Sequence, residues 1–361
     1  MIDPDAFAAL LCDWCLEVRP GHQVMVVAGT LAEPVVSALH RAILDRDAWP
    51  LLRLSPPGAL EDFYAHARER HLTEPAPLAV SELEGVDGWV RIDAPANTRA
   101  LSGVDPKLVA AVARATAPVL ETRMRLRWCA TLWPTAALAQ EAGMSLADYE
   151  RFFNRTLFLD RADPVAAWKE LSQGQARLVE RLGQADEVRI EAEGTDLRLR
   201  VGGRTWINSD GRKNMPSGEV FTGPLEDSVT GTVRFTIPSN HRGAQVEDVE
   251  LRFQNGEVVN ARAARGDARL QAALATDAGA RRLGELGIGT NSGVDRPTGS
   301  TLLDEKMAGT VHLALGRSYT ETGGVNQSAV HWDLICDLRD GGRLSADGEV
   351  IDVPAVVGGV E

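Results

Sequence analysis

The first half of the chain alternates short apolar runs with amphipathic segments. Four apolar runs have the length and composition of buried strands: residues 23–29, 50–55, 88–94 and 127–134. Helical periodicity is found between and after them: residues 33–46, 59–70, 106–123, 145–157 and 163–182. Strands that alternate with helices of this length are typical of a parallel sheet with crossover helices. We therefore expect residues 1–185 to form an α/β domain with a mostly parallel, doubly wound sheet.

After about residue 185 the pattern changes to alternation with a period of two. Residues 246–264 alternate apolar and polar positions around the turn sequence "QNGE", which indicates a hairpin. One helical pattern interrupts, at residues 268–287, before strands resume at residues 309–316 and 329–338. We expect residues 186–361 to form an α+β domain rich in antiparallel strands.

Composition and charge narrow the class of protein. The chain has 361 residues, of which 44% are hydrophobic and 25% charged, which is typical of a globular protein. Its formal net charge of -13 repels phosphate backbones and argues against a nucleic-acid partner. No run reaches the ~18 to 20 apolar residues that span a bilayer, and the first residues lack the pattern of a signal peptide. We expect a cytoplasmic protein with no membrane partner.

Two of the four cysteines form a CxxC motif, Cys12 and Cys15. The motif occurs in redox and zinc sites, but no second CxxC follows to complete a tetrahedral site. It also lies within an apolar pattern of helical period. Because free cysteine packs as a small hydrophobic residue, we interpret both as buried thiols.

Candidate chemistry begins with His331 and Asp333 in "AVHWDLICDL". Side chains two positions apart on a strand share a face, so these two should lie together, opposite Trp332 and Leu334. An imidazole beside a carboxylate can be a solvated edge, a buried ion pair or a pair of metal ligands.

Three further segments place polar side chains in unusual settings. Glu219 lies in the turn-rich "GRKNMPSGEVFTGP", next to apolar residues. Glu285 is expected at the C-terminal end of the helix 268–287, where the helix dipole disfavours a carboxylate unless an arginine or a cation compensates. Glu305 precedes His312, which interrupts the apolar run of a strand.

Together the four segments supply four carboxylates and two imidazoles. Such a set suits two divalent ions that share a bridging carboxylate. Because no thiolate falls in these segments, oxygen and nitrogen donors favour zinc, cobalt or manganese.

The same residues carry a resemblance to a known family. "NMPSGEVFTGP", "RLGELGIGTN", "DEK…GTVHLALGRSY" and "N…SAVHWDL" resemble, in order and approximate spacing, the metallo-aminopeptidases of the aminopeptidase T / aminopeptidase S type. "CLEVRPGHQVMV" and "APANTRAL" extend the resemblance over most of the chain. It implies a homodimer with a C-terminal catalytic domain.

The resemblance also implies roles for single residues. Glu219 would bind one metal ion and Glu285 would bridge both. The further ligands would be Glu305, His312, His331 and Asp333. Tyr319 matches the active-site tyrosine of the family. The chain departs from the family in two places: Glu305 and His312 are two residues further apart, and the loop after Tyr319 is shorter.

The resemblance implies a metal-dependent aminopeptidase that acts on peptides with a free N-terminus. Two divalent ions would activate a water molecule, and the Tyr319 hydroxyl would donate to the oxyanion. Glu219 or Glu305 would shuttle the proton to the leaving amine. Two alternatives remain open: a mononuclear iron ring-cleaving dioxygenase that uses His312, His331 and Asp333, and a catalytically inactive relative. A carboxylate at position 285 favours two ions over one.

Overall fold

A computed structural model describes residues 2–241 and 244–357. The chain forms two compact units. The first contains Met1–Val165 with Gly211–Pro216, and the second contains Ala166–Asp210 with Ser217–Glu361. No helix in the described part of the chain combines the length and apolar character needed to cross a bilayer.

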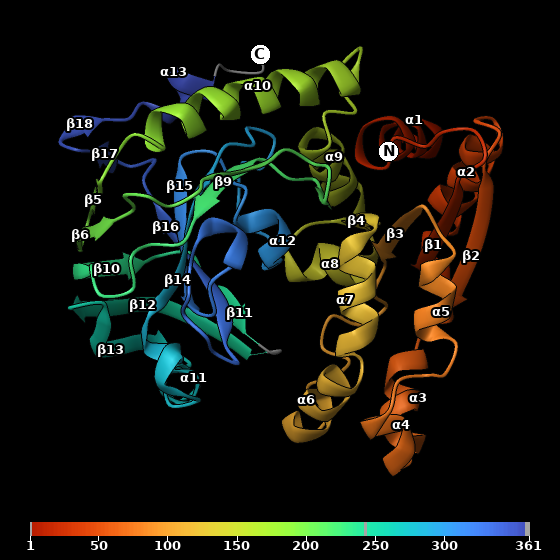
Figure 1. Ribbon diagram of the computed structural model, residues 1–361, viewed down its shortest axis with the longest axis horizontal. Helices are drawn as coiled ribbons and strands as arrows, with labels where there is room; N and C mark the ends of the chain where they lie inside the picture. The colour runs from red at the N-terminus through yellow and green to blue at the C-terminus, as the bar shows by residue number, and fades with distance from the viewer. Residues whose placement is uncertain (1, 242–243, 358–361) are drawn as a thin grey trace. The chain divides into compact units, whose positions relative to one another are not determined.

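The first unit is built on a parallel five-stranded sheet in the order β2-β1-β3-β4-β8 (Figure 1). Because the chain runs outward from β1 to β2 and then back past β1 to β3, the two crossover connections lie on opposite faces of the sheet. This confirms the expected doubly wound sheet. The strands are β1 (Gln23–Gly29), β2 (Trp49–Ser55), β3 (Gly88–Asp93), β4 (Arg127–Leu132) and β8 (Asn214–Met215).

Local sequence signals set the ends of the helices in this unit. Asp3 caps α1 ahead of Pro4, and Ser145 caps α9 through the backbone N–H of Asp148. The α-helices are α1 (Pro4–Leu10), α2 (Glu33–Leu44), α3 (Ala59–His66), α4 (Glu69–Thr73), α5 (Ala79–Glu84), α6 (Pro106–Ala115), α7 (Ala117–Arg125), α8 (Ala136–Glu141) and α9 (Leu146–Thr156). A π-helical turn, η1 (Leu11–Cys15), and a 3₁₀ turn, η2 (Thr30–Ala32), complete the set.

Two expectations for this unit can be compared with the structure. The single helix expected over residues 106–123 is wrong, because the helix breaks at Thr116 and the next one begins at Ala117, with Pro118 in its first turn. The buried-thiol interpretation of the CxxC motif is confirmed, since Cys12 and Cys15 are both buried and carry free thiols. Burial raises the pKa of Cys12 to about 12, so it is a poor nucleophile and ligand at neutral pH.

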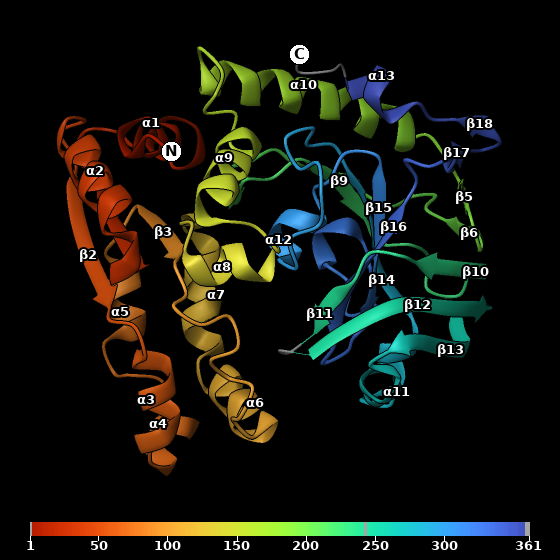
Figure 2. The same ribbon diagram turned by 180° about the vertical axis from the view of Figure 1, so that it is seen from behind.

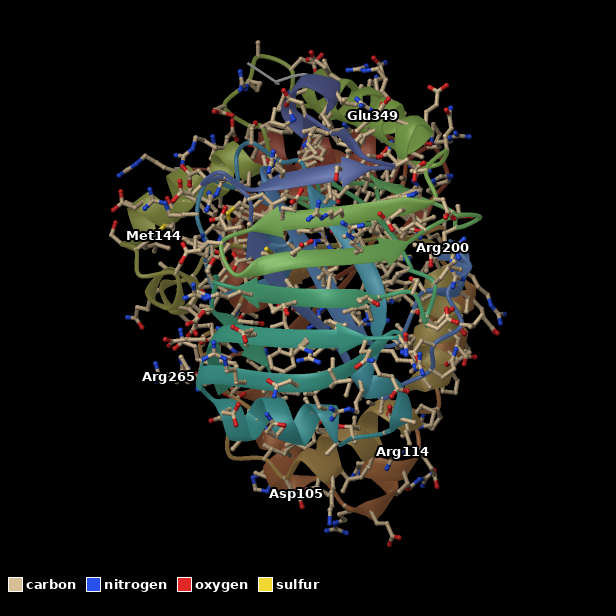
Figure 3. The ribbon with its side chains drawn as sticks, turned by 90° about the vertical axis from the view of Figure 1, so that its left-hand side faces the viewer. Asp105, Arg114, Met144, Arg200, Arg265 and Glu349 are labelled. Carbon is tan, nitrogen blue, oxygen red and sulfur yellow. The ribbon has the colours of Figure 1, made fainter. Side chains whose placement is uncertain are left out.

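The second unit contains an antiparallel sheet in the order β11-β12-β10-β6-β5-β17-β18, with β13 paired to β12 (Figure 2). Charged side chains cover its outer face, which Figure 3 shows from the front. Cross-strand pairs such as Arg189 with Asp196 and Arg262 with Glu250 link neighbouring strands there. The strands are β5 (Glu187–Ala192), β6 (Thr195–Arg200), β10 (Thr230–Phe235), β11 (Ser239–His241), β12 (Ala244–Gln254), β13 (Glu257–Arg265), β17 (Arg343–Ala346) and β18 (Glu349–Val350).

A second antiparallel sheet, in the order β16-β15-β14-β9-β7, packs against the first. The strands are β7 (Ile207–Ser209), β9 (Glu219–Thr222), β14 (Leu283–Gly289), β15 (Thr310–Gly316) and β16 (His331–Asp337). The helices of the unit are α10 (Pro164–Leu182), α11 (Asp267–Leu274), α12 (Thr301–Asp304) and α13 (Val353–Val357), with 3₁₀ turns η3 (Ala278–Arg281) and η4 (Thr320–Thr322). The antiparallel α+β expectation for this half is confirmed.

The helix expected over residues 268–287 is wrong in its second half. It ends at Leu274, and Glu285 lies on the fully buried strand β14. The pairing of β14 with β15 shifts by one residue between Leu283 and Glu285, so Gly284 is an extra residue on β14. A Cβ at Gly284 would overlap the carbonyl oxygens of Gly316 and Arg317. Glycine is therefore required for this close approach, and the apolar positions around it imitate a helical period.

Candidate metal centre

Five of the candidate ligands come from four neighbouring strands, and the sixth, Glu305, directly follows the short helix α12. In the sheet register, Glu285, Ala314 and Asp333 lie side by side across β14, β15 and β16. His312 lies two residues from Ala314 and therefore on the same face of β15. Glu219, the first residue of β9, pairs with Gly289 of β14. One face of this sheet thus gathers polar groups from segments more than 100 residues apart in the sequence.

His331 and Asp333 share a face of β16, as their spacing predicts. Trp332, on the opposite face, donates from its indole Nε1 to Ser239 Oγ at 2.9 Å. Residues 332 and 334 are buried, whereas the His331 and Asp333 side chains keep 18% and 10% of their surface exposed. The two candidate ligands are therefore the more accessible residues at this end of the strand.

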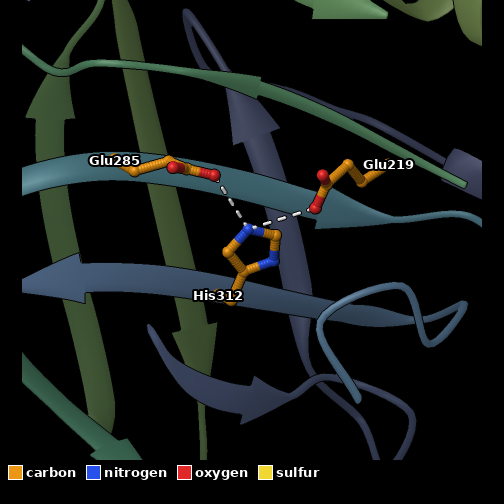
Figure 4. Close-up of side chains that lie close together, drawn as sticks. All are labelled: Glu219, Glu285 and His312. Carbon is orange, nitrogen blue, oxygen red and sulfur yellow. Dashed lines mark hydrogen bonds and ion pairs between the residues drawn. The ribbon is translucent and has the colours of Figure 1, made fainter. Parts of the chain in front are cut away.

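The distances between these side chains are those of a compact cluster. His312 Nε2 lies 3.1 Å from Glu285 Oε1 and 3.4 Å from Glu219 Oε2 (Figure 4). His331 Nε2 lies 3.6 Å from Glu285 Oε2 and 3.7 Å from Asp333 Oδ1. The two oxygens of Glu285 therefore face two different imidazoles.

The structure brings all six predicted ligands together. Three groups each have ligand atoms within 4.8 Å of one another: Glu219, Glu285 and His312; Glu285, His331 and Asp333; Glu305, His312 and Asp333. The first two groups have only Glu285 in common. An arrangement of this kind can hold one cation in each group with a shared carboxylate between them.

Unsatisfied oxygens in the cluster fit a cation. Glu219 Oε2 and Asp333 Oδ1 are buried and accept no hydrogen bond from the described residues. Buried carboxylate oxygens that accept no hydrogen bond cost free energy, which a bound cation would offset. The structure therefore supports a divalent-metal site of carboxylate and imidazole donors.

His331 is oriented by a contact on its other side. Its Nδ1 lies 2.9 Å from the carbonyl oxygen of Arg317, which can only accept, so Nδ1 carries the proton. Nε2 is then the ring nitrogen that faces Glu285 and Asp333. A hydrogen bond of this kind fixes the tautomer of a metal-binding histidine.

Burial and neighbouring charges raise the pKa values of Glu219, Asp333 and His312. Burial raises the pKa of Glu219 to about 7 and that of Asp333 to about 6, although Lys306 and His331, respectively, partly oppose this. Burial alone would lower the pKa of His312, but its hydrogen bond to Glu285 and the nearby carboxylates raise it to about 9. In the metal-free protein, protons therefore compete for the sites that a cation would occupy.

Lys306 is a residue of the cluster that the sequence analysis missed. It is fully buried, and its Nζ donates to Glu219 Oε1 at 2.6 Å and also to Glu305 Oε1. Burial alone would lower the pKa of Lys306, but the two carboxylates outweigh this and raise it, so the ammonium stays charged. The sequence does offer a signal for Lys306: it directly follows the candidate ligand Glu305, and the chain contains only four lysines.

Tyr319 lies at the border of the cluster. Its ring centroid is 5.1 Å from that of His331 and 5.7 Å from that of Phe221, and 39% of the residue is exposed. Partial burial and the carboxylates of the cluster raise the pKa of Tyr319 above its usual value. The hydroxyl therefore stays protonated and can donate a hydrogen bond.

Gly287 gives the His312 ring its space. It pairs with His312 across β14 and β15, and a Cβ at Gly287 would overlap the imidazole. We expect Gly287→Ala to displace the ring and to weaken metal binding by about 10- to 100-fold. Competition with a chromophoric chelator measures the affinity. Gly103→Ala is the control, because a Cβ there meets no atom within 4 Å. An unchanged affinity in Gly287→Ala would show that His312 does not bind the ion.

Known proteins are similar to most of the chain. A family described as thermophilic metalloprotease (M29) matches residues 3–352. Aminopeptidase 2 of Geobacillus stearothermophilus is 31% identical over 395 aligned residues, which cover 96% of this chain and 94% of that protein. Aminopeptidase T of Thermus thermophilus is 32% identical over 293 residues, which cover 69% of this chain and 71% of that protein.

Solved structures show the same fold. Wild-type AmpT from Thermus thermophilus superimposes with a TM-score of 0.81 at 26% identity, and covers 95% of this chain and 94% of its own. A 2,5-dihydroxypyridine dioxygenase from Pseudomonas putida superimposes with a TM-score of 0.63 at 14% identity, over 97% and 96% of the two chains. The second likeness is one of fold alone.

Proposed function

The chain belongs to the thermophilic metalloprotease (M29) family and is a metallo-aminopeptidase, and on that premise we propose that it removes N-terminal residues from peptides at a centre of two divalent ions. The observation that carries the two-ion proposal is the placement of Glu285. Its oxygens lie 3.1 Å and 3.6 Å from the Nε2 atoms of His312 and His331. His312 and His331 fall in different groups of ligand atoms, and Glu285 belongs to both groups, which favours two ions over one.

We propose Glu219, Glu285 and His312 as ligands of one ion, and Glu285, His331 and Asp333 as ligands of the other, with Glu305 as a further ligand. Zinc, cobalt and manganese all suit these oxygen and nitrogen donors. When bound, the two ions would supply Lewis acidity, lower the pKa of a water molecule and anchor the free α-amine of the substrate. Residues 186–361 would then form the catalytic domain.

The side chains at the border of the site provide the remaining chemistry. The Tyr319 hydroxyl would donate a hydrogen bond to the oxyanion that develops on the scissile carbonyl. Proton transfer to the leaving amine requires a carboxyl group that is protonated near neutral pH. In the metal-free protein, burial raises the pKa of Glu219 to about 7, whereas Lys306 and His312 outweigh burial at Glu305 and lower its pKa. The one of these two carboxylates that binds no ion would carry the proton.

Hydrolysis of short peptides tests the proposed function. Protein loaded with Zn²⁺, Co²⁺ or Mn²⁺ is expected to release free amino acids from unblocked dipeptides and aminoacyl anilides. A chelator should abolish this activity, and the metal ion should restore it. N-acetylated versions of the same substrates are the matched control and should resist, because they lack the α-amine that an ion would anchor.

Metal analysis of the purified protein separates the alternatives. Two zinc-like ions per chain would support the proposal. A single iron per chain, with no release of amino acids from any unblocked peptide, would instead support a ring-cleaving dioxygenase. We also propose a homodimer, for which sedimentation should give twice the chain mass of 38.9 kDa.

A further inference from the structure

Lys306 is a buried cation inside a cluster that is proposed to bind cations. Its side chain has 1% of its surface exposed, so it cannot reach a substrate. Its ammonium contacts one oxygen of Glu219 and one oxygen of Glu305. Burying a charge in this way is costly unless both the charge and its partners are compensated. The charge itself therefore requires an explanation.

The backbone around Lys306 holds the ammonium in a defined place. The Lys306 N–H donates to the carbonyl oxygen of Leu303 at 3.0 Å, at the end of α12. Its own carbonyl oxygen accepts from the N–H of Asn291 at 2.9 Å. The side chain therefore extends from a fixed point towards the start of β9.

The two oxygens of the Glu219 carboxylate have different neighbours. Oε1 accepts from Lys306 at 2.6 Å, whereas Oε2 faces His312 and accepts no hydrogen bond from the described residues. With Oε1 engaged, the carboxylate cannot rotate away from the cluster. Lys306 thus leaves the oxygen that would bind an ion pointing into the site.

We propose that Lys306 is a positioning residue, an internal counter-cation that holds Glu219 and Glu305 in their binding positions before a metal ion arrives. This inference rests on the proposed metal site. Without Lys306, two buried carboxylates would repel each other and the site would need the metal ion to assemble. With it, the metal-free cluster is already organised.

The test compares Lys306→Met with the wild-type protein, since methionine keeps most of the length of the side chain and removes the charge. In the presence of a chelator, we expect Tm to fall by on the order of 10 °C, as for other buried ion pairs that lose one partner. Saturating Mn²⁺ should recover most of that loss, so the Tm increase caused by metal is larger in the variant. Lys169→Met, an exposed lysine on α10, is the matched control and should behave as wild type.

Hydrogen exchange supplies a local readout that loss of packing alone would not move. In chelator, peptides that cover β9 and α12 should exchange faster in Lys306→Met than in the wild type, and Mn²⁺ should restore their protection. An equal Tm loss with and without metal, with no metal-dependent change in protection, would mean that Lys306 only fills space and would overturn the proposal.

A double variant separates charge from volume and covers the case in which Lys306→Met does not fold. Lys306→Met combined with Glu305→Gln removes one cation and one anion together. It should be more stable in chelator than Lys306→Met alone. A double variant that is no more stable than the single one overturns the proposal. If the wild-type protein takes up no metal, the proposed function fails, whereas the comparison in chelator still reports on Lys306.

Discussion

Protein that carries Glu285→Gln is expected to lose aminopeptidase activity by about 10³-fold or more. The carboxylate lies between His312 and His331 with one oxygen directed to each. An amide keeps the shape of this side chain but offers one oxygen instead of two and carries no charge. It can therefore serve one of the two groups at most, and the loss of a shared ligand removes several kcal/mol of transition-state stabilisation. Steady-state hydrolysis of an aminoacyl anilide measures the effect.

Metal content is the second readout of the same variant. We expect Glu285→Gln to retain at most one tightly bound ion per chain by elemental analysis. Glu180→Gln, an exposed glutamate on α10, is the matched control and should keep the full metal content and activity. A Glu285→Gln protein that keeps both ions and most of its activity would contradict the bridging role.

In chelator, the protein is expected to lose stability as the pH rises from 6.5 to 9.5. The pKa of His312 is raised from 6.5 to about 9 in the folded state, so the folded protein holds this proton more tightly than the unfolded chain does. The resulting stabilisation is fully present below pH 6.5 and is lost as the pH rises through 9. Its size is on the order of 3 kcal/mol. Glu219, with its pKa raised to about 7 by burial, changes stability in the same direction between its ordinary pKa and 7.

Urea unfolding at a series of pH values in chelator measures this loss. His312→Gln should flatten the pH dependence, whereas His66→Gln, on the exposed end of α3, should leave it unchanged. An identical slope in the wild type and in His312→Gln would exclude His312 as its source. Metal affinity should show the opposite trend and rise with pH, because the ion and the proton compete for the same atoms.

Local pattern was sufficient to predict some of the site and insufficient for the rest. The shared face of His331 and Asp333 follows from the two-residue period of a strand, and the structure confirms it. Glu285 was placed on a helix because Leu283, Leu286 and the preceding alanines imitate a period of 3.6. Gly284 and Gly287 are the residues that indicate a strand, because both lie very close to β15 or to the residue after it. These contacts involve residues some 30 positions away, so a local sequence pattern does not predict them.

The convergence of the four segments could not be derived from spacing. Glu219 and Asp333 are separated by more than 100 residues, and only the strand order β16-β15-β14-β9 brings them together. Resemblance to a family supplied that grouping. Lys306 was missed for a related reason: an ion pair between neighbours in sequence is usually a solvated surface feature, and only the burial of α12 gives it a different meaning.

Because Gly284 is an extra residue on β14, the site depends on the number of residues in this strand as well as on the identity of its side chains. The register of β14 against β15 shifts by one residue at Gly284. Glu285 therefore stays opposite Ala314, and beside Asp333, only while the number of residues from 284 to 289 is preserved. A single insertion or deletion inside that interval would turn the carboxylate towards the apolar layer and a leucine towards the ions. Homologous sequences that still fold this way should therefore vary in length elsewhere, in the surface turns, and keep this interval constant.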